Sequence, residues 1–365
     1  MKAPRILPVL AAVVVTSLAF SLFAASLNAQ RPAGGTLRGR VVDATTGMPL
    51  ENANVFLALT VLGTSTDEQG NFTITRIPPG TYRLVVSRLG YQMQAQSVTI
   101  GESESFWREF NMSERILLAD EVTVSGSAQN AWKQHRKDFA EKFLGSGDNA
   151  SLCTIVNPEV ITFGIDSISH NLLASSDELI QVENRALGYR VKIALGLFSW
   201  DLRRDQGQYL IYPEFEPLQT QHQDSLEFWE KNRRENYLAS MQHFLSSLVA
   251  GTLEQEHFEV NIGTLTFLRS GGRRGIDPGD VTIESTDLWG LKRVMFNDWL
   301  QVEQYRKRGK EVNFLSLDQG VVLVDSLGNL NDPLSVHVIG PWQDRRVADM
   351  VPLSWMMKET GTGQR

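Results

Sequence analysis

Six histidines are the first candidates for catalytic chemistry, because imidazole is the commonest metal ligand and a frequent general base. They are His135, His170, His222, His243, His257 and His337. A zinc peptidase needs two histidines and a glutamate, with H-x-x-E or H-E-x-x-H as its local signature. No histidine in this sequence has glutamate at either spacing. We therefore predict no zinc site and assign no metal ligand.

Other catalytic signatures are also missing. The sequence holds no G-x-S-x-G around a nucleophilic serine. The run Gly271 to Gly275 lacks the Lys-Ser/Thr pair of a phosphate-binding loop, so a flexible hairpin is the better interpretation. Asp67 and Glu68 beside Gly70 lack the alternating oxygen ligands of a calcium loop and predict a plain turn. We expect no cofactor and assign no catalytic or cofactor-binding residue.

Acidic residues leave an enzyme as one open alternative. Glu254, Glu256 and Glu259 cluster in the sequence, but a glycosidase needs two acids roughly 5 to 10 Å apart across a cleft. Proximity in the chain does not establish that geometry, and a solvated loop is the favoured interpretation. An enzyme of unrecognised type would draw on acids such as Glu159, Glu183 or Glu254.

Tryptophans point to binding rather than to catalysis. Six of the eight lie in the second half of the chain: Trp200, Trp229, Trp289, Trp299, Trp342 and Trp355. Most should be core residues, because large aromatics dominate burial, but an exposed subset would favour carbohydrate binding. The single cysteine, Cys153, excludes an intramolecular disulfide, and we expect it to be an inert buried side chain.

The first 29 residues have the pattern of a secretory signal peptide. Lys2 and Arg5 precede an apolar run from Ile6 to Phe23, and small residues follow up to Ala29. The alternative is an uncleaved N-terminal anchor, and no later stretch is apolar enough to span a membrane. We expect an exported protein, located in the periplasm, at the periphery of an outer membrane or outside the cell. The net charge of −7 argues against nucleic acid as a partner.

Residues 36–112 read as short alternating strands separated by turn residues. Tyr82, Leu84 and Val86 point one way, for example, while Arg83 and Val85 point the other. About seven such strands, with a turn signal roughly every ten residues, predict a seven-stranded antiparallel β-sandwich.

A motif in this region resembles a known family. Its residues are Gly39, Val41, Asp43, Thr46, Gly47, Pro49, Leu50, Ala53, Val55, Thr66, Asp67, Gly70, Phe72, Ile77, Pro79, Gly80, Tyr82, Gly90 and Tyr91. The pattern resembles the carboxypeptidase regulatory-like domain, a prealbumin-like β-sandwich of exported bacterial proteins. The resemblance implies a fold and no particular activity, because such domains sit beside peptidases, receptors and carbohydrate-active enzymes, and related folds bind starch.

Residues 113–131 are expected to form a connector. Leu118 to Gly126 resembles the segment that follows this domain in TonB-dependent receptors, although a last strand plus a linker is the favoured interpretation. About 240 residues remain, without the repeated amphipathic strands of a transport barrel.

Residues 132–358 predict a second, mostly β domain, followed by a frayed tail at 359–365. A helix from Trp132 should end at Gly145, and one long amphipathic helix should span Ser225 to Val249. Several short motifs here resemble an uncharacterised family of exported bacterial proteins with the same domain in front. They are Phe143-Leu144-Gly145, Cys153, Asn157 to Val160, Glu183-Asn184, Leu187 to Tyr189, Trp229, Arg233, Asp332 to Ser335 and Arg345 to Leu353.

These observations favour a non-enzymatic binding or scaffold protein of the cell envelope, with a glycan or an envelope protein as its partner. Two alternatives stay open. One is an accessory component of a TonB-type outer-membrane receptor system, and the other is an enzyme in the second domain.

Overall fold

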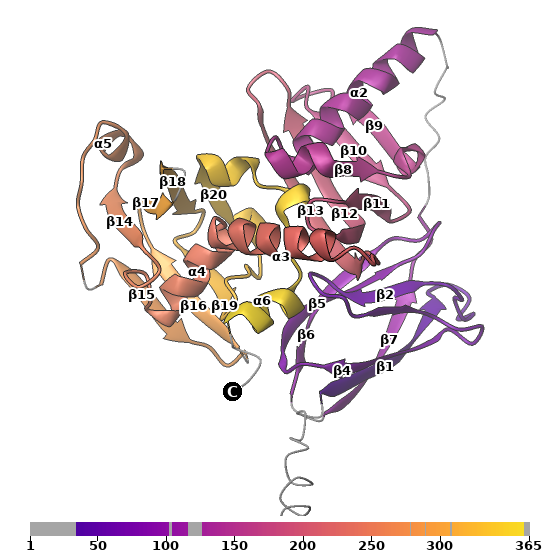
Figure 1. The fold of residues 1–365 in the computed structure, drawn as a ribbon. Coiled ribbons are helices and arrows are strands. Elements are labelled where there is room, and N and C mark those ends of the chain that lie inside the picture. Colours follow the sequence, from indigo (N-terminus) through magenta and orange to yellow (C-terminus); the bar gives the residue numbers. More distant parts are fainter. Residues whose placement is uncertain are drawn as a thin grey trace, which may run out of the picture.

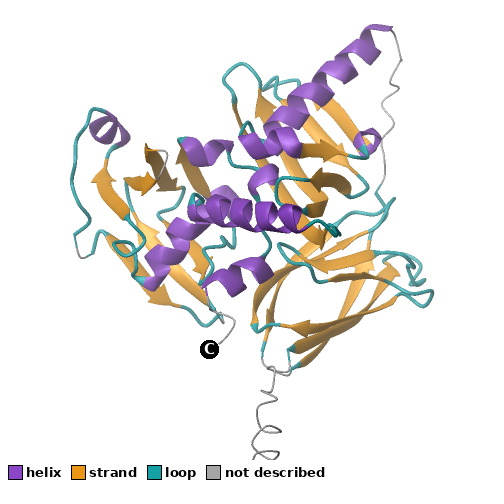
Figure 2. Ribbon diagram, viewed as in Figure 1, coloured by secondary structure: helices purple, strands orange, loops and turns teal. Residues whose placement is uncertain are grey.

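The computed structural model describes residues 34–101, 104–115, 126–277, 279–288, 290–306 and 309–360. The predicted signal peptide, residues 118–125 of the receptor-like segment, Trp289 and residues 361–365 of the predicted tail lie outside the described residues. Mainly β architecture is confirmed (Figure 2). Figure 1 shows the first seven strands at the lower right, six further strands with helix α2 at the upper right, and the last strands at the left. No described helix is long and apolar enough to cross a membrane.

The first seven strands form the predicted β-sandwich. They are β1 (Gly35–Asp43), β2 (Asn54–Leu57), β3 (Gly63–Ser65), β4 (Asn71–Ile77), β5 (Gly80–Ser87), β6 (Gln94–Ile100) and β7 (Ser105–Met112). They make two sheets, of order β4-β1-β7 and β3-β2-β5-β6. We call this unit the N-terminal sandwich. Its core is built by alternation, so that Leu37, Leu84 and Phe110 are buried between the sheets.

One pairing in the sandwich differs from the antiparallel expectation. Strand β7 runs parallel to β1 along its whole length, from the Thr36–Ser105 pair to the Asp43–Met112 pair. The reason lies in the path of the chain, which leaves β6 in one sheet and enters the other beside the start of β1. There the Thr36 N–H donates to the Glu104 carbonyl at 2.8 Å.

A six-stranded sheet follows, covered on one face by a helix. It contains β8 (Cys153–Ile155), β9 (Ile161–Ile165), β10 (Leu172–Ser176), β11 (Ile180–Asn184), β12 (Tyr189–Asp201) and β13 (Gln206–Pro217). Helix α2 (Gly126–Leu144) begins inside the expected connector and ends at Gly145, whose φ of +99° suits glycine. Phe139 of α2 lies 4.8 Å from Phe198 of β12, ring centre to ring centre.

The N-terminal sandwich packs its second sheet against the six-stranded sheet. Phe56 and Val85, on the outer face of β3-β2-β5-β6, are buried with Leu179 and Ala194 of the neighbouring sheet. Backbone bonds join the units as well, since the Leu59 N–H donates to the Pro213 carbonyl at 2.7 Å. The arrangement is a stack of three layers, with sheet β4-β1-β7 outermost.

The long helix expected over Ser225 to Val249 is two helices, which corrects that prediction. They are α3 (Gln223–Leu238) and α4 (Met241–Ala250). Ser240 caps α4, because its side chain accepts a hydrogen bond from the His243 N–H. The break frees carbonyls at the end of α3, and distant side chains hydrogen-bond to them, as described below.

The last strands form two small sheets, which we call the C-terminal sheet pair. One has the order β14-β17-β18-β20 and the other β15-β16-β19. The strands are β14 (Phe258–Gly263), β15 (Val281–Ser285), β16 (Leu291–Phe296), β17 (Trp299–Arg306), β18 (Gly309–Leu317), β19 (Val321–Asp325) and β20 (Val336–Ile339). Phe244 and Leu248 of α4 pack into the core between these sheets. The sequence did not predict β16, because Lys292 and Arg293 interrupt its apolar pattern.

The remaining helices are short. They are α5 (Leu265–Arg269), α6 (Leu353–Thr360) and five 3₁₀ turns at Asp148–Leu152, Pro158–Val160, Pro333–Ser335, Pro341–Asp344 and Val347–Asp349. The segment before α6 returns to the six-stranded sheet, so that Val347, Val351 and Met356 share one core with Leu37 and Val191. The domain boundaries drawn from the sequence stay a prediction.

Candidate ligand cavity

A cavity of about 1010 Å³ lies where the N-terminal sandwich, the six-stranded sheet and the C-terminal sheet pair meet. This volume is at the upper end of the range of small-molecule sites, roughly 300 to 1,000 Å³. Its lining comes from β5 and β6 of the N-terminal sandwich, from β13, from the α3–α4 junction, from the C-terminal sheet pair and from the segment before α6. Side chains from residue 58 to residue 353 therefore contribute to one space.

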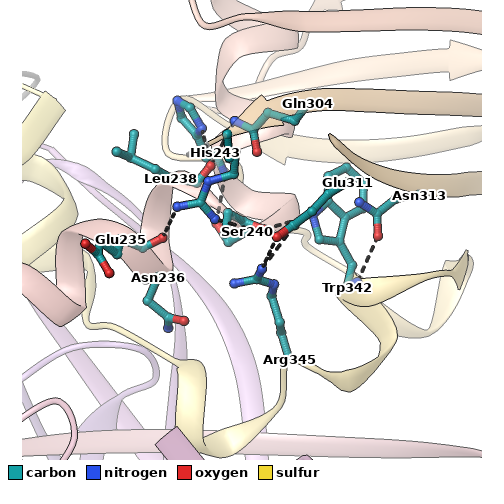
Figure 3. A network of polar contacts seen from close by, with 12 residues as sticks. Glu235, Asn236, Leu238, Ser240, His243, Gln304, Glu311, Asn313, Trp342 and Arg345 are labelled. Atoms are coloured by element: carbon teal, nitrogen blue, oxygen red, sulfur yellow. Dashed lines mark hydrogen bonds and ion pairs between the residues drawn. The ribbon is translucent and has the colours of Figure 1, made fainter. Parts of the chain in front are cut away.

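The α3–α4 junction forms one wall, and a network of side chains holds it (Figure 3). The last carbonyls of a helix have no partner within the helix. Here Arg306 donates to the Glu235 carbonyl at 2.8 Å and Gln304 donates to the Leu238 carbonyl at 2.9 Å. The Trp342 indole N–H donates to the Ala239 carbonyl at 2.9 Å. The wall is thereby fixed to β17 and to the Pro341–Asp344 turn.

The same wall contains Arg345, which is positioned by an acid. Its guanidinium lies 3.1 Å from a carboxylate oxygen of Glu311 on β18. Nearby, Asn313 of β18 accepts the Trp342 backbone N–H at 2.8 Å. Both contacts tie the C-terminal segment to β18 (Figure 3).

The segment from Arg345 to Leu353 contacts residues from several distant parts of the chain, including Asn184 of the Glu183-Asn184 motif. Asn184 donates to the Ala348 carbonyl at 2.9 Å, and Asn149 donates to a carboxylate oxygen of Asp349 at 2.8 Å. Asn236 of α3 donates to the Asp349 carbonyl. Next to them, the Arg346 guanidinium lies over the Trp200 ring at 4.5 Å and donates to the Lys142 carbonyl at 2.5 Å.

The turn from Arg185 to Gly188 is held by α3 in a similar way. Trp229 donates to the Arg185 carbonyl at 2.8 Å, and Arg233 donates to the Leu187 carbonyl at 2.8 Å. The Arg233 guanidinium also lies over the Tyr189 ring at 4.2 Å. Two of the short motifs, the W-x-x-x-R motif of Trp229 and Arg233 and the motif from Leu187 to Tyr189, thus form one structural contact between α3 and the β11–β12 turn.

The acids proposed for an unrecognised enzyme do not meet in the cavity. Glu159 and Glu254 are exposed, and Glu183 is paired with Arg185 at 2.7 Å, a hydrogen bond that lowers the Glu183 pKa. Glu256 lies 3.1 Å from His243, and Glu259 lies 3.9 Å from Arg273. Among the described residues, no group of three or more His, Cys, Asp and Glu side chains could hold a metal ion.

Three other acids line the cavity, namely Asp325, Asp332 and Asp349, and burial raises the pKa of Asp325 and Asp349. Asp332 accepts the Leu334 backbone N–H at 3.1 Å. Asp325 accepts backbone N–H groups from Leu327 at 2.8 Å and Asn329 at 2.9 Å, so its carboxylate closes its own turn. The Asp349 carboxylate accepts the Asn149 amide already described. Each acid therefore has a structural bonding role within the fold. Asp325 could not be identified from the sequence, because the residues around it carry no pattern that indicates a buried turn.

The tryptophans are mostly core, as expected. Trp200, Trp229, Trp342 and Trp355 are buried, and each indole N–H has an acceptor. Trp200, Trp299 and Trp342 also contribute to the cavity lining. The most exposed described tryptophan is Trp107 on β7, which is not one of the six tryptophans in the second half of the chain. Alternation with the buried Phe110 and Met112 was the signal that could have identified it.

The rest of the lining is rich in aromatic rings, amides and hydroxyls. Tyr209, Tyr212, Gln208 and Gln242 all face the cavity. Burial raises the pKa of both tyrosines, so their hydroxyls stay protonated and can donate. Across the cavity, Asn331 joins the sandwich to the C-terminal sheet pair, because Arg83 donates to its carbonyl at 2.8 Å. This combination suits an uncharged ligand with many hydroxyl groups.

Cys153, the first residue of β8, is half-buried. Its thiol donates to the Asn149 carbonyl with a sulfur-to-oxygen distance of 3.3 Å. Burial raises the pKa of the thiol to about 12, with the nearby Asp349 charge as a smaller cause. A thiol with such a pKa is a poor nucleophile at neutral pH.

Comparison with known proteins identifies the first part of the chain. Residues 37–124 match the family described as CarboxypepD_reg-like domain, which confirms the resemblance inferred from the motif. A search of the curated proteins finds no match.

Solved structures with a similar segment include a group B streptococcus pilus 2b backbone protein, with 20% identity and a TM-score of 0.21 over 23% of this chain and 42% of that one. A cohesin-X-dockerin complex from Acetivibrio cellulolyticus has 21% identity and a TM-score of 0.20, over 22% of this chain and 58% of that one. A Klebsiella pneumoniae 5-hydroxyisourate hydrolase has 20% identity and a TM-score of 0.19, over 22% of this chain and 85% of that one. Likenesses this low carry no argument about function.

Proposed function

We propose that this chain is an exported, non-enzymatic binding protein of the cell envelope, and that its cavity holds an uncharged glycan. The observation that carries the proposal is the lining of the cavity. Aromatic rings stack on the apolar faces of sugars, while amides and hydroxyls exchange hydrogen bonds with sugar hydroxyls. Tyr209, Tyr212, Gln208 and Asn331 supply both kinds of group.

The roles of the buried acids support binding over catalysis. A general acid must reach the bond that it protonates. Asp325 is bonded into its own turn and Asp349 to Asn149, so both acids with raised pKa values already have partners in the fold. Export is proposed from the signal-peptide pattern of residues 1–29.

Calorimetric titration of the purified protein with neutral hexasaccharides of glucose, xylose and N-acetylglucosamine tests the proposal. We expect at least one of them to bind, and Tyr212→Ala to weaken that binding about tenfold through the loss of one stacking surface. Tyr305→Ala is the matched control, because Tyr305 is an exposed aromatic side chain outside the cavity lining.

Three results would contradict the proposal. The first is that no neutral oligosaccharide binds. The second is that Tyr212→Ala binds as tightly as the unmodified protein. The third is the release of shorter sugars on prolonged incubation, which would show that the site is catalytic.

A further inference from the structure

The outermost sheet of the molecule has an outward face whose residues do not line the cavity. In sheet β4-β1-β7 the buried residues Leu37, Val41 and Phe110 face the sandwich core, so the residues between them face outward. The other sheet of the sandwich lies against the six-stranded sheet, and no other described element covers this face (Figure 1). We call it the outer face.

An exposed indole lies on the outer face. Trp107 is 58% exposed and sits directly opposite Arg38 of β1, which in turn sits opposite Thr73 of β4. The next row of the sheet places Glu109, Arg40 and Asn71 side by side. Because paired strands fix these neighbours at close spacing, the indole, the guanidinium and the hydroxyl form a rigid surface.

The charge of this layer is opposite to that of the chain. The strands β4, β1 and β7 carry four arginines, of which Arg38 and Arg40 alternate onto the outer face, whereas Arg108 is on the same side of β7 as Phe110 and Arg76 lies near the end of β4. The acids of these strands are Asp43 and Glu109. Asp43 is buried and accepts hydrogen bonds from Thr45 and Thr46, so Glu109 is the only exposed acid on these strands. None of the four arginines forms an ion pair with a described acid. The chain as a whole has a net charge of −7.

We propose that the outer face binds an acidic glycan, one whose sugars carry carboxylates. A sugar ring would stack on Trp107 while its carboxylate accepts hydrogen bonds from Arg38. Thr73 and Asn71 are placed to bond the sugar hydroxyls. This site is separate from the cavity, and its existence does not depend on the function proposed above.

The edge of the sheet argues against an extended peptide as the ligand. A peptide that adds a strand needs free backbone groups along the edge strand. On β7 the Trp107 carbonyl already accepts a hydrogen bond from Arg108 at 3.1 Å, and the Asn111 carbonyl accepts one from Gln94 at 2.7 Å.

The test compares polygalacturonate with its fully methyl-esterified form, which has the same sugar backbone without the charges. Binding of each polymer is measured by calorimetry on the full chain at 50 mM and 500 mM salt. We expect the acidic polymer to bind at low salt and the ester to bind at least about tenfold more weakly. Trp107→Ala and Arg38→Ala should each weaken the binding of the acidic polymer by about tenfold or more.

Two variants serve as controls, and both should bind polygalacturonate normally. Tyr305→Ala removes an exposed aromatic side chain elsewhere, and Tyr212→Ala alters the cavity. A loss of binding in Tyr212→Ala, with Trp107→Ala unaffected, would move the site to the cavity and overturn the proposal. Equal binding of the ester, no binding of either polymer, or equal competition by polyglutamate or single-stranded DNA would overturn it as well.

Discussion

The contact between α3 and the Arg185–Gly188 turn can be tested with two glycines that have the same positive φ. Gly188 and Gly47 both have a φ of +69°. A methyl group added at Gly188 would lie 2.2 Å from the Trp229 indole, whereas one added at Gly47 would meet no atom within 4 Å. Both alanine variants therefore carry the strain of a positive φ, and only Gly188→Ala adds a steric clash.

The expected costs follow from these two terms. An alanine at positive φ costs about 1 to 2 kcal/mol, which sets the loss of stability in Gly47→Ala. Overpacking a fixed core contact adds about 1 to 3 kcal/mol, so Gly188→Ala should lose about 2 to 5 kcal/mol in total. Urea unfolding followed by far-ultraviolet circular dichroism measures both values, and an unchanged slope with urea indicates the same unfolding transition.

The difference between the variants is the decisive quantity. If Gly188→Ala is no less stable than Gly47→Ala, then Trp229 is not held against the turn. The hydrogen bonds from Trp229 and Arg233 to the turn carbonyls would in that case not fix α3, and the structural account of the W-x-x-x-R motif would be refuted.

Two further predictions concern the buried groups behind the cavity. Burial raises the pKa of Asp349, so the folded protein binds the proton of this carboxyl group more tightly than the unfolded chain does. The protonated carboxyl group therefore contributes to the stability of the fold, and this contribution is lost as the pH rises from the ordinary pKa of 3.8 through the pKa of the folded state. Asp349→Asn should therefore unfold at a higher urea concentration than the unmodified protein at pH 7.5, with a smaller advantage at pH 4.5, and a constant difference would contradict this. Cys153, whose pKa burial raises to about 12, should resist iodoacetamide in the native protein at pH 8 and react after unfolding in urea. Rapid native labelling would show that the thiol is accessible.

Local patterns were enough to predict the strands of the N-terminal sandwich except the short β3 (Gly63–Ser65). The alternation of Tyr82, Leu84 and Val86 with their outward neighbours gave the correct inner face of β5. The same alternation placed Val85 outward, yet Val85 is fully buried because a second sheet covers it. Burial by a partner from a distant part of the chain leaves no local signal.

The helix break and the cavity show the same limit. Ser240 is a good helix cap, but the partners of the freed carbonyls, Arg306, Gln304 and Trp342, come more than sixty residues later. The cavity likewise has no local motif, because its lining is collected from strands, helices and turns across the chain. Trp107 is different, since the pattern of β7 already placed it on the outward side.

The return of the chain's last helix to its first module has a consequence for the folding rate. The Leu353 N–H donates to the Leu59 carbonyl at 2.7 Å, and Met356 is buried in the same core as Leu37. Contacts between residues so far apart in the sequence raise the contact order, which slows folding. Until the C-terminal residues have docked, this core is incomplete and its apolar surface is open to self-association.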